Sequence, residues 1–116
     1  MKSREPTVAR QSAQLSSMAD EVALEDRALE LRQQGKSFPA IARLLGYERG
    51  GYEALRAFKR ALRRLPAVEQ ASLRQQEMAR LVAMEEAFMA DTTLSVEERN
   101  RCLGAVAALR AMLRIV

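Results

Sequence analysis

Residues that favour β-strands are scarce in this sequence, and that scarcity restricts its possible folds more than any other feature. Aromatic residues make up only 4% of the 116 positions, whereas alanine, leucine, arginine, glutamate, glutamine and methionine are abundant. These abundant residues lose little side-chain freedom in a helix, so they favour helical structure. Hydrophobic residues account for 48% of the chain, the normal share for a globular protein. The composition therefore predicts a small all-α protein.

The reactive side chains of many enzymes are missing: the sequence contains no histidine and a single cysteine, Cys102. Without histidine, neither nucleophile–imidazole pairs nor histidine-ligated metal sites can form. One cysteine cannot close an intrachain disulfide or build a zinc site, so we expect Cys102 to be a packed, unreactive thiol. A carboxylate enzyme without a metal stays open, but no pattern favours one. We expect no catalytic site, no metal and no cofactor.

The hydrophobic residues are distributed without a membrane or export signal. No segment approaches the roughly 20 apolar residues of a membrane span. Residues 1–6 lack the apolar core of a signal peptide. We therefore expect a cytoplasmic protein.

The N-terminal third of the chain changes from polar to periodic sequence near residue 20. Residues 1–19 are rich in serine, glutamine and alanine without a sustained apolar period, which predicts a mobile arm. Apolar residues then recur at helical spacing and predict a helix over about 21–34. Asp20 is its expected N-cap, and Gly35 can take the left-handed conformation that ends a helix.

Two short helices are predicted next. The first covers about 38–45, with Ser37 as its N-cap and Gly46 at its end. The second starts near Tyr52 and ends before Pro66. Their apolar positions repeat at helical spacing and are Phe38, Ile41, Leu44 and Leu45 in the first, and Leu55, Phe58, Leu62 and Leu65 in the second.

The C-terminal part predicts an antiparallel helical hairpin. One helix is expected over about 67–90, and Asp91-Thr92-Thr93 breaks its pattern. Ser95 followed by Glu98 is a capping box, so a further helix opens at residue 96. A short turn between two helices brings them side by side. The domains expected are thus 1–19, 20–65 and 66–116.

Positive charge is concentrated in the middle of the chain. The whole protein carries a net charge of +4, but residues 36–65 hold eight basic and two acidic side chains, a local net charge of +6. Such one-signed density is repulsive unless a polyanion lies against it. A merely solvated basic face is the alternative interpretation, and a membrane-surface helix is less favoured. After Glu53 the predicted helix carries Arg56, Lys59, Arg60, Arg63 and Arg64 and no acid.

The same segment fits the requirements of a helix-turn-helix. Two short helices cross closely when the first has a small residue, here Ala42, and the turn four residues later tolerates a left-handed conformation, here Gly46. Apolar residues at flanking positions would form the small core between them. We therefore expect Ala42 and Gly46 to be structural. A three-helix bundle without DNA binding is the alternative. The flanking positions are Ile41, Leu45, Tyr47, Tyr52 and Leu55.

The segments ALELRQQGKSFPAIARLLGY (28–47) and ALRAFKRAL (54–62) resemble small helix-turn-helix proteins of actinobacterial phages. Many of these are taken to be terminase small subunits, which recognise viral DNA for packaging. The resemblance covers about residues 22–65, and the hairpin resembles these proteins by architecture only. It implies viral DNA as a ligand, a ring assembled through the hairpin, a large ATPase terminase subunit as a partner, and a bacterial host cell.

The sequence leaves three functions open: genome packaging, a dimeric phage regulator or excision factor, and a helical interaction module without DNA binding. A large ring would favour packaging and a dimer would favour regulation. The expected DNA contacts, to phosphates and base edges, are Lys36, Arg43, Arg49, Gly51, Arg56, Lys59, Arg60, Arg63 and Arg64. The expected oligomer interface consists of Met78, Leu81, Val82, Phe88, Val106, Leu109 and Leu113.

Overall fold

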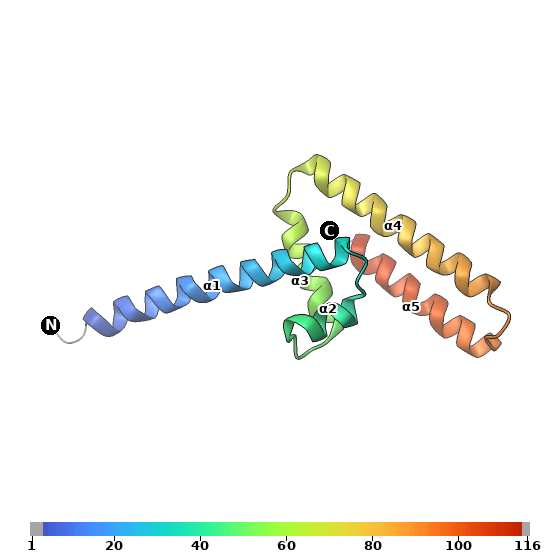
Figure 1. Ribbon diagram of the computed structural model, residues 1–116, viewed down its shortest axis with the longest axis horizontal. Helices are drawn as coiled ribbons and strands as arrows, with labels where there is room; N and C mark the ends of the chain where they lie inside the picture. The colour runs from blue at the N-terminus through green and yellow to red at the C-terminus, as the bar shows by residue number, and fades with distance from the viewer. Residues whose placement is uncertain (1–3, 115–116) are drawn as a thin grey trace. The chain divides into compact units, whose positions relative to one another are not determined.

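The computed structural model describes the backbone of residues 4–114 and the side chains of residues 17–113 (Figure 1). This part of the chain is all-α, as predicted. It forms two compact units, Met1–Arg64 and Leu65–Val116. The helices, without any strand in the described range, are α1 (Arg4–Gln33), α2 (Phe38–Leu45), α3 (Gly51–Arg63), α4 (Ala67–Ala90) and α5 (Val96–Arg114).

Helix α1 begins much earlier than the apolar periodicity predicted. It starts at Arg4, so the predicted start near residue 21 is wrong, and Asp20 lies inside the helix instead of capping it. Alanine and glutamine favour a helix even without an amphipathic period. Pro6 falls in the first turn, where its missing N–H costs no hydrogen bond. Residues 1–3 of the predicted arm lie outside the described residues.

Helix α2 is bounded by the two caps that the sequence predicted. The Ser37 hydroxyl oxygen accepts the backbone N–H of Ala40 at 3.2 Å. Gly46 ends the helix with a φ of 75°, and its N–H donates to the carbonyl of Ala42. Gly35, after α1, also has a positive φ, of 92°. These short-range signals are confirmed.

The core of the first unit lies where α1 and α2 pack against α3. Phe38, at the start of α2, meets Phe58 of α3 edge to face, with their ring centroids 5.6 Å apart. Ala42 is buried, as expected for a small residue where α2 approaches α3. Among the side chains that the structure describes in this unit, the remaining buried apolar residues are Ala28, Leu29, Leu31, Ile41, Ala54, Leu55, Ala57, Ala61 and Leu62.

A buried arginine supports the connection from α1 to α2. Arg32 is only 5% exposed, and its guanidinium carbon lies 4.1 Å from the centroid of the Phe38 ring. Its Nη1 donates to the main-chain carbonyl of Lys36 at 3.1 Å. A buried charge needs such partners, and the face of an aromatic ring is a favourable one for a guanidinium.

Tyr52 does not contribute to the core between α2 and α3, contrary to the helix-turn-helix prediction. Helix α3 begins at Gly51, so Tyr52 is in its first turn, and its side chain is 57% exposed. Leu44, on α2, is also exposed. Leu55 occupies its expected buried position.

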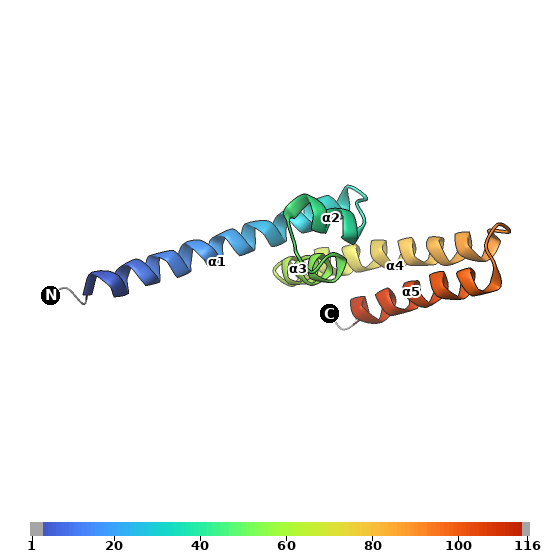
Figure 2. The ribbon, with the colours of Figure 1, turned by 90° about the horizontal axis from the view of Figure 1, so that it is seen from below.

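The second unit is an antiparallel hairpin of α4 and α5, which lie side by side in both views (Figures 1 and 2). Glu85 of α4 and Arg110 of α5 form an ion pair at 2.8 Å. The guanidinium of Arg99 donates to the carbonyls of Phe88 and Asp91, at 3.2 and 2.8 Å. These contacts hold the start of α5 against the end of α4.

The turn of the hairpin is built from short-range bonds, of which the sequence predicted the capping box. Ser95 Oγ accepts the N–H of Glu98 at 3.1 Å, and Glu98 Oε1 accepts the N–H of Ser95 at 3.2 Å, which completes the capping box. Asp91 Oδ1 accepts the hydroxyl and the N–H of Thr93. The buried apolar residues of the hairpin, in the described range, are Leu73, Leu81, Val106 and Leu113.

Candidate nucleic-acid interface

Helix α3 carries apolar residues on one side and basic residues on the other. Its buried positions are 54, 55, 57, 58, 61 and 62. A helix turns by about 100° per residue. The exposed positions 52, 56, 60 and 63 and the half-buried position 59 therefore fall within an arc of about 100° on the opposite side. We call this arc the basic face of α3; it consists of Tyr52, Arg56, Lys59, Arg60 and Arg63.

The positive charges on the basic face disfavour one another. Partial burial, followed by repulsion from Arg63 and Arg56, lowers the pKa of Lys59 below its ordinary value. The Arg56 guanidinium lies over the Tyr52 ring, 5.8 Å from its centroid. A polyanion placed along this face would relieve the repulsion.

Arg64, a predicted DNA contact, pairs with acidic residues of α1, although 38% of its side chain is exposed. Its Nη1 donates to Glu25 Oε1 at 2.6 Å, and its Nη2 donates to Asp26 Oδ1 at 2.9 Å and to the Val22 carbonyl at 3.5 Å. Hydrogen bonds from Asp26, then from Glu25, raise the pKa of Arg64. Arg64 therefore links the end of α3 to α1.

Arg60 shares the carboxylate of Glu25 with Arg64, but more loosely. Its Nη1 lies 3.4 Å from Glu25 Oε2, and half of its side chain is exposed. The Glu25 side chain is only 11% exposed. Sequence reasoning missed Glu25; the signal was its position three, four and seven residues before Ala28, Leu29 and Arg32, on the buried side of α1.

Gly51, a predicted DNA contact, lies close to Pro39 of α2 in the structure. A Cβ atom on Gly51 would lie 3.2 Å from the nitrogen, Cγ and Cδ of Pro39. The start of α3 thus passes close to α2, and a side chain at Gly51 would require Pro39 to shift by a few tenths of an ångström. Of the other predicted contacts outside α3, Lys36 lies between α1 and α2, Arg43 on α2 and Arg49 in the turn, and all are exposed.

A small hollow opens at the start of α3, with a volume of about 160 Å³. Glu53 Oε2 accepts the backbone N–H of Arg49 at 3.0 Å, so the turn is fixed against the first turn of α3. Three guanidinium groups and one carboxylate surround this space. We call it the basic hollow; its lining residues are Arg49, Tyr52, Glu53, Arg56 and Arg60.

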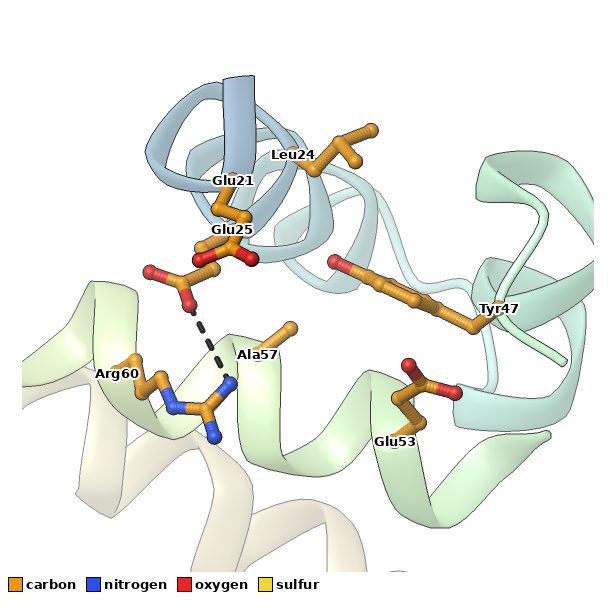
Figure 3. A pocket seen from close by; sticks show the side chains of 7 residues that line it. All are labelled: Glu21, Leu24, Glu25, Tyr47, Glu53, Ala57 and Arg60. Atoms are coloured by element: carbon orange, nitrogen blue, oxygen red, sulfur yellow. Dashed lines mark hydrogen bonds and ion pairs between the residues drawn. The ribbon is translucent and has the colours of Figure 1, made fainter. Parts of the chain in front are cut away.

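A larger hollow of about 340 Å³ lies between α1, Tyr47 and α3 (Figure 3). The side chains of Glu21 and Glu25 project from α1 into this space. Tyr47 projects from the turn, with its hydroxyl directed towards them. Burial, then the charges of Glu25 and Glu53, raise the pKa of Tyr47 above 10.0. We call this space the acidic hollow. Arg60 and Glu53 line both hollows.

The structure divides the predicted oligomer interface into covered and exposed residues. Leu81, Val106 and Leu113 are buried in the single chain, so they are corrected to interior positions. Val82 is 44% exposed. Met78, Phe88 and Leu109 are half-buried, as is Cys102, a free thiol.

Comparison with known proteins gives no relative for this chain: no family model, no curated protein and no solved structure matches it. Across the described residues, no helix is both long and apolar enough to cross a membrane. The same part of the chain holds no cluster of three or more acidic, cysteine or histidine side chains arranged for a metal ion.

Proposed function

We propose that this protein binds duplex DNA through the basic face of α3. The observation that carries the proposal is the coincidence of four cations on the one side of α3 that does not face the core. An α-helix fits the major groove, where arginine and lysine can reach phosphates and guanine edges. Helix α3 spans about 20 Å, since its 13 residues each rise about 1.5 Å.

The biological role that we propose is recognition of viral DNA for packaging, as in terminase small subunits. The support is the resemblance of residues 28–47 and 54–62 to the helix-turn-helix of such phage proteins. A dimeric phage regulator or excision factor would use the same basic face. The mass of the assembly separates these roles, because a ring favours packaging and a dimer favours regulation.

Salt dependence tests the DNA-binding proposal. If four to six phosphates are neutralised, a log–log slope of about −0.9 per contact lowers affinity by roughly two orders of magnitude or more between 50 and 200 mM salt. Replacing Arg56 with alanine should reduce both affinity and slope, whereas Arg101→Ala, an equal charge loss on an exposed site of α5, should not. A titration without salt dependence would refute the proposal.

A second function, self-association through the hairpin, is favoured by exposed apolar side chains on α4. Val68, Val82 and Met89 are 82, 44 and 62% exposed. They are separated by multiples of seven residues, so they recur on one side of the helix. Exposed apolar side chains that share one helix side are typical of protein contacts. We propose that a second copy of the chain covers them.

Light scattering of the full chain tests this association. A dimer or larger assembly at micromolar concentration is expected, and Val82→Glu should convert it to monomer without loss of helix. Gln76→Glu places the same charge on an exposed site of α4 outside this stripe and should leave the mass unchanged. A wild-type monomer would exclude self-association and, with it, the ring.

A further inference from the structure

Arg60 occupies a position that no other cation of α3 shares, between a basic and an acidic hollow. On one side it completes a set of three guanidiniums with Arg49 and Arg56. On the other side it faces the carboxylate of Glu25 at 3.4 Å (Figure 3). Its side chain is half exposed, so it has room to move between the two.

We propose that the basic hollow binds one phosphate diester of the DNA backbone, and that Arg60 leaves Glu25 to complete this site. This site rests on the proposed DNA binding and assigns one of its contacts. Guanidinium groups donate paired hydrogen bonds to phosphate oxygens, and three of them around one small space favour an anion over a neutral group. Arg49 belongs to the turn before α3, so the hollow lies at the helix start.

The pairing of Glu25 explains why Arg60, and not Arg64, is the residue that moves. Glu25 Oε1 accepts from Arg64 at 2.6 Å, and this bond remains when Arg60 departs. Glu25 would therefore keep a cationic partner, which a carboxylate of low exposure requires. Departure of Arg64 would instead break its bonds to Glu25 and Asp26 together.

Glu25 is thus a positioning residue that competes with DNA for Arg60. In the free protein its carboxylate holds Arg60 towards the acidic hollow. Removing that charge leaves Arg60 available to the phosphate, so the affinity for DNA should rise. The number of phosphate contacts should stay the same. The slope of the salt dependence should then be unchanged, because the slope counts contacts and not their strength.

The experiment measures binding of the full chain to two labelled duplexes of different sequence, by fluorescence anisotropy between 50 and 200 mM salt. Arg60→Ala should reduce the log–log slope by about 0.9 and weaken binding to both duplexes equally, as a phosphate contact requires. Arg60→Lys keeps a cation and should keep the slope. Glu25→Gln should raise the affinity for DNA by about two- to fivefold, because the pair with the half-exposed Arg60 side chain is long and therefore weak.

The double variant Glu25→Gln/Arg60→Ala tests whether Glu25 changes the affinity for DNA through Arg60. The gain from Glu25→Gln should vanish without Arg60, and Asp26→Asn, which removes a partner of Arg64 alone, should give no gain. A gain that persists without Arg60 overturns the proposal, as does an unchanged slope in Arg60→Ala or a loss confined to one duplex. The Arg60 variants decide the matter alone if Glu25→Gln does not fold. Wild-type protein that binds neither duplex refutes DNA binding itself.

Discussion

The two units of the chain bury apolar residues to very different extents. In the described part, the first unit buries twelve apolar residues, whereas the hairpin, over a similar length, buries four. In the first unit, Glu25 also forms ion pairs with two arginines, Arg60 and Arg64. The hairpin relies more on the bonds of its turn and on contacts such as Glu85 with Arg110. This difference indicates that the first unit is stabilised mainly by its own core and that the hairpin has fewer buried apolar residues to stabilise it.

The largest expected effect is a loss of stability when a cavity is created in the core of the first unit. Phe58 is 1% exposed and contacts the ring of Phe38. Phe58→Ala should lower the free energy of unfolding by about 3–5 kcal/mol. Leu81→Ala in the hairpin should cost about 2 kcal/mol, the low end for such changes, because sparse surroundings relax into the cavity. Chemical denaturation followed by circular dichroism measures both, and equal losses would contradict the contrast between the units.

Intermediate effects are expected at the small residues of α2 and its cap. Ala42→Leu should overpack the approach of α2 to α3 and cost about 1–3 kcal/mol. Gly46→Val places a β-branched residue at a φ of 75°, with a cost of at least about 1–2 kcal/mol.

Gly104 in α5 provides the matched control in the hairpin. A Cβ atom there would meet nothing within 4 Å. Gly104→Ala should therefore stabilise the hairpin by up to about 1 kcal/mol, because alanine loses less backbone freedom in a helix. Melting temperatures show whether Gly104→Ala stabilises the protein and whether Ala42→Leu and Gly46→Val destabilise it. Unchanged melting temperatures for Ala42→Leu and Gly46→Val would show that the close crossing of α2 and α3 is absent.

The smallest effect is a pH dependence at the hairpin turn. The hydroxyl and N–H of Thr93 lower the pKa of Asp91 below 3.8. A carboxyl with a lowered folded-state pKa stabilises the fold above its ordinary pKa, and the contribution is lost as the pH falls through the lowered value. Asp91→Ala should therefore melt below the wild type at neutral pH and converge with it in acid. A difference that does not change with pH would exclude the ionised carboxylate as its source.

The sequence predicted the helices that are defined by neighbouring residues. Ser37 and Ser95 each bond to a backbone N–H three positions away, so their caps could be recognised without the fold. The start of α1 could not be recognised in this way, because the first half of the helix has no apolar period and depends on helix propensity alone. The exposure of Tyr52 was missed because it depends on where α3 begins, and a shift of one residue turns a side chain by about 100°.

The sequence predicted which basic residues share a face of α3, but not which of them pair with residues of another helix. Arg56, Lys59, Arg60 and Arg63 share a face by their spacing alone. The pairing of Arg64 with Glu25 spans 39 positions, so it depends on the rotation of α1 against α3. No local pattern distinguishes Arg64, which supports the fold, from its neighbour on the basic face.

The alternation of buried and exposed positions along α3 has an evolutionary consequence. Its six buried positions, three of them alanine, are fixed by the close packing of α1 and α2. The positions of the basic face contribute little to that packing, so substitutions there should change the exposed surface of α3 without unfolding the unit. If α3 binds DNA as proposed, descendants of this protein could therefore acquire new DNA preferences one exposed residue at a time. Glu25 and Arg64 would be retained, because their bond links α1 to the end of α3.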